Sequence, residues 1–332
     1  MGLDPVVRRP SLNIAQERGV RRLTTLREVA KRLLPEALKF RSQRLKARIL
    51  LGAAMPPPRD AARGGGRHVT FVATGRNDDY APDFVGRLRS ILAWNLRHAA
   101  VEGIFVEWNP PPDRGLLSPD LCREFPRLRA YVVAPEVHAR VCANPHLQLM
   151  ESHAKNIAIR RAQTEFVLCS NTDIFVGPQM CRFIDRGELA LQTVYLTRRV
   201  DIAWDSRLRP QRQMVDPRRY VRILPLDPIG PGDFILASRK LWHTAGAFDE
   251  SLARHRLGCD GRFILHLRAL GSAVEHVGSV FHMDHPTSSH NSVQPFHGEV
   301  APFDGLPYSN PPDWGMRDAT ETPLAERVWQ LK

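Results

Sequence analysis

The sequence EFVLCSNTDIF, at residues 165–175, decides the fold of this chain. Its apolar run FVLC, at 166–169, has the length and composition of a buried strand, and it stops at SNTD before IFV resumes. Asp173 therefore follows the carboxyl end of a strand, which is the edge where open α/β sheets bind ligands. Because Asn, Thr and Asp also favour turns, this stretch alone leaves a turn and a functional site as alternatives.

The order of strand, polar loop and helix recurs on both sides of this stretch. Apolar and β-rich runs predict further strands at 68–74, 103–109, 130–134, 189–195, 234–237, 273–277 and 279–281. Helical spacing predicts helices at 82–100, 151–163, 178–185, 239–244 and 261–270. We expect Asp260 to be the N-cap of the last helix, and the Arg-rich residues 197–224 to form a substrate-facing loop.

This alternation predicts an α/β fold with a mostly parallel central sheet and helices on both faces. The polar strand ends then lie along one edge of the sheet. No GxGxxG sequence follows a strand, which disfavours a dinucleotide-binding Rossmann site.

The charge of the chain is concentrated at its N-terminus. The 332 residues carry a net charge of +12, but residues 1–65 alone hold fifteen Lys and Arg against five Asp and Glu. The remainder is nearly neutral, so the charge says nothing about its substrate. The sequence shows neither an apolar run long enough to span a membrane nor a signal peptide, and we expect a cytoplasmic protein.

Residues 20–51 alternate leucines with Lys and Arg at helical spacing, and Pro35 divides the pattern into two helices. Such a basic amphipathic segment suits an anionic membrane surface, here the inner face, or a partner protein, with an ordinary packed helix as the alternative. Nucleic acid is disfavoured because Phe40 is the only aromatic residue there. We therefore divide the chain into a helical extension (1–55), a Pro/Gly linker (56–66), the main domain (67–285) and an extended C-terminal tail (286–332).

Motifs in the main domain resemble those of GT-A fold glycosyltransferases, particularly the inverting family 2 type. The resemblance covers about residues 68–285 and rests on the loop at 74–79, Glu107, Lys155-Asn156, NTD at 171–173, GPGD at 230–233, GCD at 258–260 and His282. It implies a GT-A fold and transfer of a sugar, hexosyl in class, from a nucleotide-sugar to an acceptor hydroxyl with inversion. A UDP-sugar donor, a glycan or lipid-linked acceptor and a role in polysaccharide or glycoconjugate synthesis are the corresponding expectations.

The resemblance also implies roles for individual residues. Asp173 matches the last carboxylate of the Asp-x-Asp motif, which binds Mn²⁺ or Mg²⁺, although Asn171 replaces the first Asp. His282, with His285 as the alternative, matches a further metal ligand. Asp260 matches the catalytic base, although Cys259 stands where Glu is usual. The residues matching the donor site are Thr74, Arg76, Asp78, Glu107, Lys155, Asn156, Asn171, Thr172, Gly232 and Asp233.

The chemistry of sugar transfer fits these residue types. A divalent cation held by protein ligands neutralises the charge that grows on a departing diphosphate, and a carboxylate removes the proton of the acceptor hydroxyl. Structural alternatives remain: Asp260 as a plain helix cap, His282 as a packed core histidine, Lys155 as a solvated helix residue and Glu107 as a solvated strand end.

Two other functions are compatible with parts of this pattern. The replacements at Asn171 and Cys259 suggest a catalytically degenerate scaffold in a membrane-associated assembly. A nucleotidyltransferase would share the sheet and the metal, but it needs a Gly-rich, Lys-containing phosphate loop, which residues 74–80 lack.

Overall fold

The computed structural model describes residues 45, 68–81, 83–227, 229, 232–285 and 299–332. The chain separates into two units, Met1–Ala47 and Arg48–Lys332. Apart from residue 45, the predicted helices within 20–51 lie outside the described residues. So do the linker at 56–66, residues 230–231 of the GPGD motif and residues 286–298 at the start of the tail. The description below concerns the second unit.

The second unit alternates strands and helices along most of its length. Its helical elements are α3 (Phe84–His98), α4 (Ser118–Glu124), α5 (Pro135–Val141), α6 (Glu151–Arg161), α7 (Pro178–Asp185), α8 (Pro210–Met214), a 3-10 turn at Pro217–Arg219, α9 (Arg239–Thr244) and α10 (Cys259–Ala269). Its strands are β1 (Val69–Gly75), β2 (Glu102–Trp108), β3 (Leu128–Val133), β4 (Phe166–Ser170), β5 (Ile174–Val176), β6 (Thr193–Ala203), β7 (Tyr220–Ile223), β8 (Phe234–Ser238), β9 (His255–Leu257), β10 (Ala273–Asp284), β11 (Glu299–Val300), β12 (Glu321–Ala325) and β13 (Val328–Leu331).

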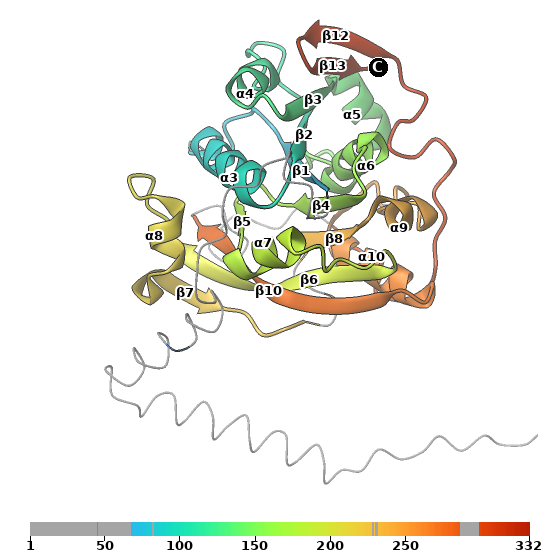
Figure 1. Ribbon diagram of the computed structural model, residues 1–332. Helices are drawn as coiled ribbons and strands as arrows, with labels where there is room; N and C mark the ends of the chain where they lie inside the picture. Colours follow the sequence, from blue (N-terminus) through green and yellow to red (C-terminus); the bar gives the residue numbers. More distant parts are fainter. Residues whose placement is uncertain (1–44, 46–67, 82, 228, 230–231, 286–298) are drawn as a thin grey trace, which may run out of the picture. The chain divides into compact units, whose positions relative to one another are not determined.

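An 11-stranded sheet runs through the unit in the order β12-β13-β3-β2-β1-β4-β8-β6-β10-β5, with β7 beside β6 (Figure 1). The strands from β13 to β4 are parallel to their neighbours, β8 is antiparallel to β4 and β6, and β10 is parallel to β6. In Figure 1, α3 and α4 lie on one side of β1 to β3, while α5 and α6 lie on the other. The predicted α/β class, with a large and mostly parallel sheet flanked by helices, is confirmed.

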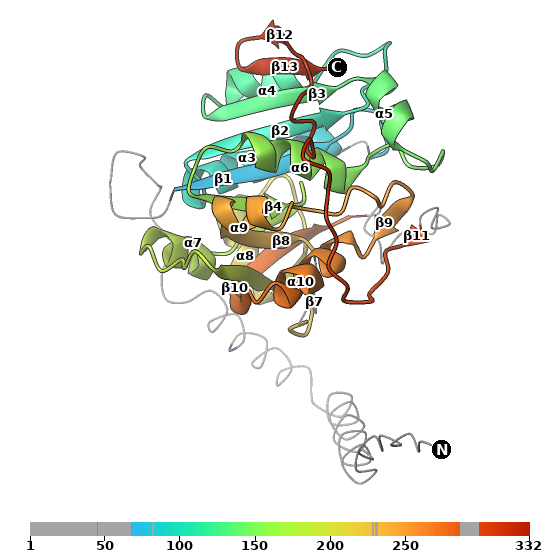
Figure 2. The same ribbon diagram turned by 90° about the vertical axis from the view of Figure 1, so that its right-hand side faces the viewer.

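Helices on both faces explain why the parallel strands are apolar throughout. All seven residues of β1 are buried, as expected for a strand covered on both sides. In α6, Ala154, Ile157 and Ala158 are buried against the sheet, whereas Glu151 in its first turn and Arg160 in its last turn suit the helix dipole. Figure 2 shows α6 lying over the sheet from the side opposite to α3.

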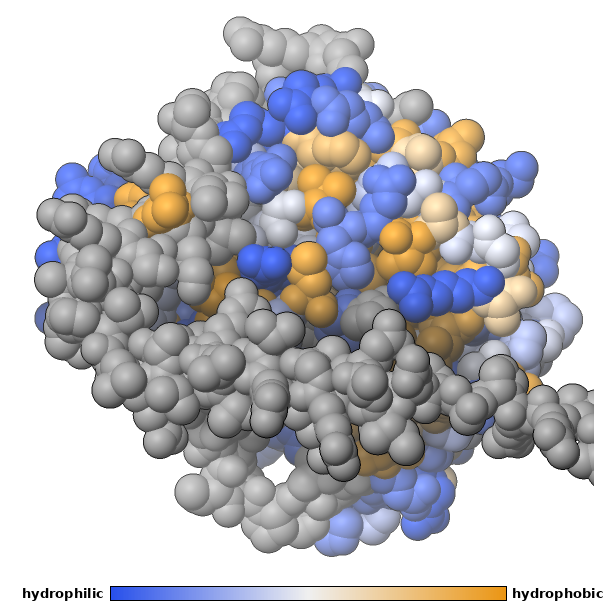
Figure 3. Space-filling view, turned by 90° about the horizontal axis from the view of Figure 1, so that it is seen from below, coloured by the Kyte–Doolittle hydropathy of each residue, from blue (hydrophilic) through white to orange (hydrophobic). Residues whose placement is uncertain are grey.

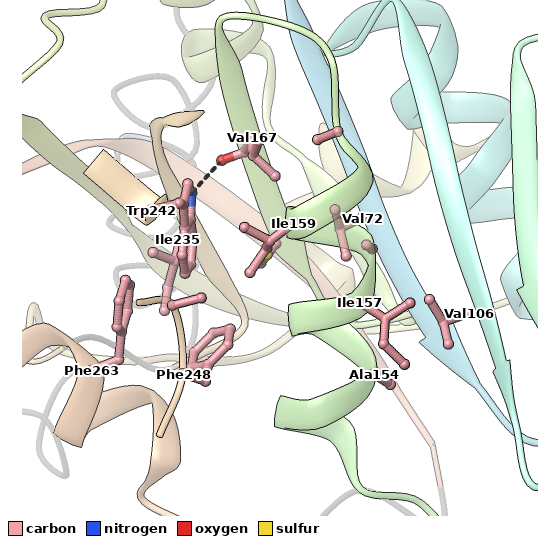
Figure 4. Close-up of a cluster of buried hydrophobic side chains, with 14 of the residues drawn as sticks. Val72, Val106, Ala154, Ile157, Ile159, Val167, Ile235, Trp242, Phe248 and Phe263 are labelled. Carbon is pink, nitrogen blue, oxygen red and sulfur yellow. Dashed lines mark hydrogen bonds between the residues drawn. The ribbon is translucent and has the colours of Figure 1, made fainter. Parts of the chain in front are cut away.

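A core of aromatic and aliphatic side chains joins α6, α9 and α10 to β4 and β8 (Figure 4). The rings of Trp242 and Phe263 are stacked, with centroids 4.5 Å apart, and Phe248 packs against both. Trp242 Nε1 donates a hydrogen bond to Val167 O at 3.1 Å. Burial of each such side chain contributes roughly 1.5–3 kcal/mol. This packing fixes α10 relative to β4.

Three local predictions were wrong. The strand predicted at 189–195 begins at Thr193 and continues to Ala203, so part of the predicted Arg-rich loop is strand β6. The two strands predicted at 273–281 form one strand, β10, with an irregularity between His276 and Ser279. The N-cap of α10 is Gly258, in the left-handed conformation (φ 82°), and Asp260 is the second residue of the helix.

The described part of the C-terminal segment contributes to the sheet. Strand β13 pairs in parallel with β3, and β12 pairs with β13 as a hairpin.

Where the surface is coloured in Figure 3, hydrophobic and hydrophilic side chains are interspersed. Among the described residues, no helix has the length and apolar character needed to cross a bilayer.

Candidate functional site

Strand pairing brings Asp173, His282 and His285 together. Asp173 follows β4 and precedes β5, whose Ile174 is the direct partner of His282 on the antiparallel strand β10. Asp173 Oδ2 lies 3.3 Å from His282 Nε2 and 3.1 Å from His285 Nε2. One candidate ligand atom from each residue lies within 4.8 Å of those of the other two. The candidate metal ligands named from the sequence thus form one cluster.

The chemistry of this cluster suits a cation. Asp173 Oδ1 is buried and has no hydrogen-bond partner among the described residues, so one carboxylate oxygen is left for a ligand. Burial alone would raise the pKa of Asp173, but hydrogen bonds and charge from His282 and His285 outweigh it and hold the pKa well below its usual value. An ionised carboxylate and two imidazoles are a donor set for a divalent metal ion.

Two residues that the sequence did not suggest lie behind His282. Asp201, on β6, is the direct partner of His282 in the parallel pairing of β6 with β10, and its Oδ1 lies 3.1 Å from His282 Nδ1. Arg199 Nη2 lies 2.9 Å from the same nitrogen. Burial disfavours a charged imidazole, yet hydrogen bonds with Asp173 and Asp201 outweigh it and raise the pKa of His282 to about 9.

A chain of hydrogen bonds leads from this cluster to α6. The pairing of Ser170 with Phe234 places Asp233, which precedes β8, beside Asn171, which follows β4. Asn171 Nδ2 donates to Asp233 Oδ1 at 3.0 Å, and Asn171 Oδ1 accepts from Lys155 Nζ at 3.1 Å. Arg199 Nη1 donates to Asp233 Oδ2 at 2.6 Å. The oxygen and the nitrogen of the Asn171 side-chain amide are therefore both used in contacts with neighbouring charged residues.

Lys155 and Asp260 form the far end of this chain. The Lys155 ammonium is almost fully buried and lies 2.6 Å from Glu151 Oε1 and 3.9 Å from Asp260 Oδ1. Burial alone would lower the pKa of Lys155, but the charges of Glu151 and Asp260 outweigh it and raise the pKa. Lys155 is thus a buried cation between two carboxylates.

Asp260 has the properties of a proton acceptor. Burial raises its pKa; Lys155 opposes this, the negative charges of Glu151 and Asp233 add to it, and the result is a pKa of about 6. Its side chain is one third exposed, so a ligand can reach it. A Cβ atom on Gly232 would lie 1.8 Å from Asp260 Oδ2, so the backbone at Gly232 approaches this carboxylate as closely as only glycine allows.

The loop after β1 lies near the same cluster. Arg76 Nε lies 3.1 Å from Asp78 Oδ1, and the Arg76 guanidinium lies 4.4 Å from the centre of the Tyr80 ring. Burial raises the pKa of Tyr80, and the negative charge of Asp173 adds to this. Thr74 is buried near the end of β1. Thr172, between Asn171 and Asp173, is partly exposed.

Two residues that were predicted to bind the donor form hydrogen bonds with other residues of the protein instead. Glu107 is fully buried, and its carboxylate accepts hydrogen bonds from the backbone of Leu117 and from the backbone and hydroxyl of Ser118, at the start of α4. The Asn156 amide bonds the backbone of Phe248 and the carboxylate of Glu250. The structure does not bring these two groups to the cluster, because each one anchors a neighbouring segment.

No protein-family model and no curated protein sequence matches the chain. Among solved structures, it is similar to GalNAc-T7 with UDP, GalNAc and Mn²⁺ (TM-score 0.44, 11% identity, 66% of this chain and 43% of that chain). It is also similar to residues 1–349 of S. aureus TarS in complex with UDP (TM-score 0.42, 13% identity, 66% of this chain and 61% of that chain). The chain spans less than two thirds of either.

Both of these structures are of GT-A glycosyltransferases, the family whose motifs the sequence resembles. Because the TM-scores and identities are low, the strand order described above defines the fold, and the argument for function rests on the residues of the site.

Proposed function

We propose that this protein is a metal-assisted glycosyltransferase, which moves a sugar from a nucleotide-sugar to the hydroxyl of a glycan or lipid-linked acceptor. The observation that carries this proposal is the connection between two groups. Asp173 Oδ1 has no partner among the described residues, and Asp173 Oδ2 contacts His282. From His282, contacts run through Arg199, Asp233, Asn171 and Lys155 to Asp260, a carboxylate with a raised pKa. A cation site and a proton acceptor along one sheet edge suit this transfer.

Asp173, His282 and His285 would hold the cation. When bound, a divalent cation neutralises the negative charge that grows on the departing diphosphate. Imidazole is a softer donor than the oxygen ligands that Mg²⁺ prefers, so this set favours Mn²⁺. Arg76, in the loop after β1, offers a further positive charge on the side of the donor.

Asp260 would act on the acceptor. Its carboxylate takes the proton of the acceptor hydroxyl while that oxygen forms a bond to the anomeric carbon of the donor. The bond from the anomeric carbon to the diphosphate breaks, and its electron pair leaves with the nucleoside diphosphate. Attack from the opposite side inverts the configuration, and general base catalysis of this kind contributes roughly 10²–10⁴-fold in rate.

The direct test is a panel of nucleotide-sugars, UDP-sugars first, incubated with purified protein and Mn²⁺ and analysed for release of the nucleoside diphosphate. We expect release from at least one donor, loss of release with EDTA, and loss in Asp173→Asn. Asp120→Asn, which changes an exposed carboxylate on α4, is the matched control and should keep full activity. Release that EDTA leaves unchanged would contradict the role of the cation.

A catalytically degenerate scaffold is the second candidate, and the replacement of the first motif carboxylate by Asn171 favours it. Calorimetry separates the two candidates. A scaffold that still recognises the donor binds UDP-sugars without turnover, whereas an enzyme binds them and releases the diphosphate. Membrane or partner docking through residues 20–51, which would place the protein at the inner face of a membrane, is a separate proposal that either candidate allows.

A further inference from the structure

A cluster of buried charges lies directly behind His282. Asp201 has no exposed surface, and its direct partners on the neighbouring strands are His282 on β10 and Arg222 on β7. Asp201 Oδ1 accepts a hydrogen bond from Arg199 Nε at 2.6 Å, and Asp201 Oδ2 accepts one from Arg222 Nε at 2.8 Å. Two arginines therefore hold this carboxylate in one orientation, and that orientation aims Oδ1 at the His282 ring.

The two nitrogens of His282 face different neighbours. Nε2 lies 3.3 Å from Asp173 Oδ2, in the candidate cation site, whereas Nδ1 lies 3.1 Å from Asp201 Oδ1 and 2.9 Å from Arg199 Nη2. Of these two neighbours, a protonated Nδ1 can donate to Asp201 but not to Arg199, and a bare Nδ1 can accept from Arg199 but not from Asp201. In a neutral ring, only the first arrangement leaves the lone pair of Nε2 available to a cation.

We infer that Asp201 is a positioning residue for the cation site: it accepts the Nδ1 proton of His282 and thereby turns the Nε2 lone pair toward Asp173. This inference rests on the proposed cation site. Carboxylates that orient a metal-binding imidazole in this way raise metal affinity by about 10- to 100-fold. The fixed register of β6, β10 and β5 makes the alignment a property of the sheet.

Arg199 extends the same cluster toward the acceptor side. Its Nη1 donates to Asp233 Oδ2 at 2.6 Å, and Asp233 follows Gly232, the residue that approaches Asp260. One guanidinium therefore contacts the carboxylate that orients His282 and the carboxylate next to the loop at Asp260. Arg199 therefore connects the carboxylate behind the cation ligands to the segment that lies against the proposed base.

The first test measures Mn²⁺ affinity by electron paramagnetic resonance, with thermal unfolding as a check that each variant is folded. We expect Asp201→Asn to bind Mn²⁺ about 10- to 100-fold more weakly than the wild type. Asp205→Asn is the matched control: Asp205 pairs with Arg207 and Arg219 just after β6 and should leave the affinity unchanged. Unchanged affinity in folded Asp201→Asn overturns the inference.

The second test uses protein with Asp201 intact, so it decides the inference even if Asp201→Asn does not fold. Nitrogen-15 NMR of histidine-labelled wild-type protein, loaded with diamagnetic Zn²⁺, identifies the protonated ring nitrogen of His282, with His282→Gln giving the assignment. We expect a proton on Nδ1 and none on Nε2, and the opposite pattern overturns the inference. If the wild-type protein binds neither Mn²⁺ nor Zn²⁺, the cation site itself is refuted. That result differs from a failure of the Asp201 inference alone, in which the wild-type protein still binds the cation.

Discussion

Replacing Gly232 by alanine tests the close approach between the loop before β8 and the proposed base. The new Cβ would lie 1.8 Å from Asp260 Oδ2, 2.0 Å from Cγ and 2.3 Å from Cβ. Since carbon and oxygen atoms do not approach within about 3 Å without bonding, the two groups must separate by more than about 1 Å. A displacement of 1 Å at a reacting group can cost about 10²-fold in rate.

We therefore expect Gly232→Ala to lower kcat/KM for transfer about 10²-fold, equivalent to about 2.7 kcal/mol of transition-state stabilisation. Overpacking of this kind also destabilises the fold by about 1–3 kcal/mol, a modest loss that thermal unfolding will show. Gly86→Ala is the matched control. Gly86 is an exposed residue of α3 with nothing near its Cβ position, so alanine there should leave transfer unchanged and stabilise the helix slightly.

A double-mutant cycle with Asp260→Asn decides how the alanine acts. If Gly232→Ala works by displacing the carboxylate, it has little further effect once that carboxylate is gone, and the double variant matches Asp260→Asn alone. Additive losses in the double variant, or full activity in Gly232→Ala, would refute the reasoning.

Three further predictions concern pH, stability and the N-terminus. Because the base must be ionised and the pKa of Asp260 is about 6, kcat/KM in a pH–rate profile should fall about tenfold per pH unit below pH 6. Lys155→Met removes the positive charge that lowers this pKa, so in that variant the fall in kcat/KM should begin at a higher pH. Arg199→Met removes the positive charge that pairs with two buried carboxylates, Asp201 and Asp233, and should cost about 3–5 kcal/mol in urea unfolding, whereas Arg207→Met, at an exposed pair, should cost less than about 1 kcal/mol. Deletion of residues 1–55 should abolish sedimentation with vesicles that contain anionic lipid while transfer in solution continues; equal vesicle binding by both forms would contradict this docking role.

The sequence predicted strands β1 to β4 well because buried parallel strands are continuous apolar runs, whereas strand β13 lies in the segment predicted to be an extended tail. It also placed Asp173 after a strand, and His282 and His285 at a strand end, where the structure brings them together. The predictions failed where charge is buried. In β6 the sequence TRRVD contains three charged residues, which are typical of a surface loop, yet the Asp201 side chain is buried between arginines and a histidine.

The roles that we propose for Asp201 and Arg199 could not be predicted from the sequence because they depend on strand pairing. The register that places Asp201 beside His282 joins residues about 80 positions apart, and no local pattern specifies it. The alternation of Val200 and Ile202 is a weak strand signal that was available. Glu107 and Asn156 are the opposite case, because they were predicted to bind the donor and instead bond to neighbouring segments of the protein. The sequence does not distinguish a polar side chain that faces a ligand from one that bonds to the protein backbone.

The pairing of β13 with β3 has a consequence for synthesis on the ribosome. Val328 pairs with Ala130, so about 200 residues must be translated after β3 before its outer edge finds its partner. At about 5–20 residues per second, that edge stays open for roughly 10–40 s in each newly made chain. An unpaired strand edge is a template for aggregation, so nascent chains should be most vulnerable, and most in need of a chaperone, during this interval.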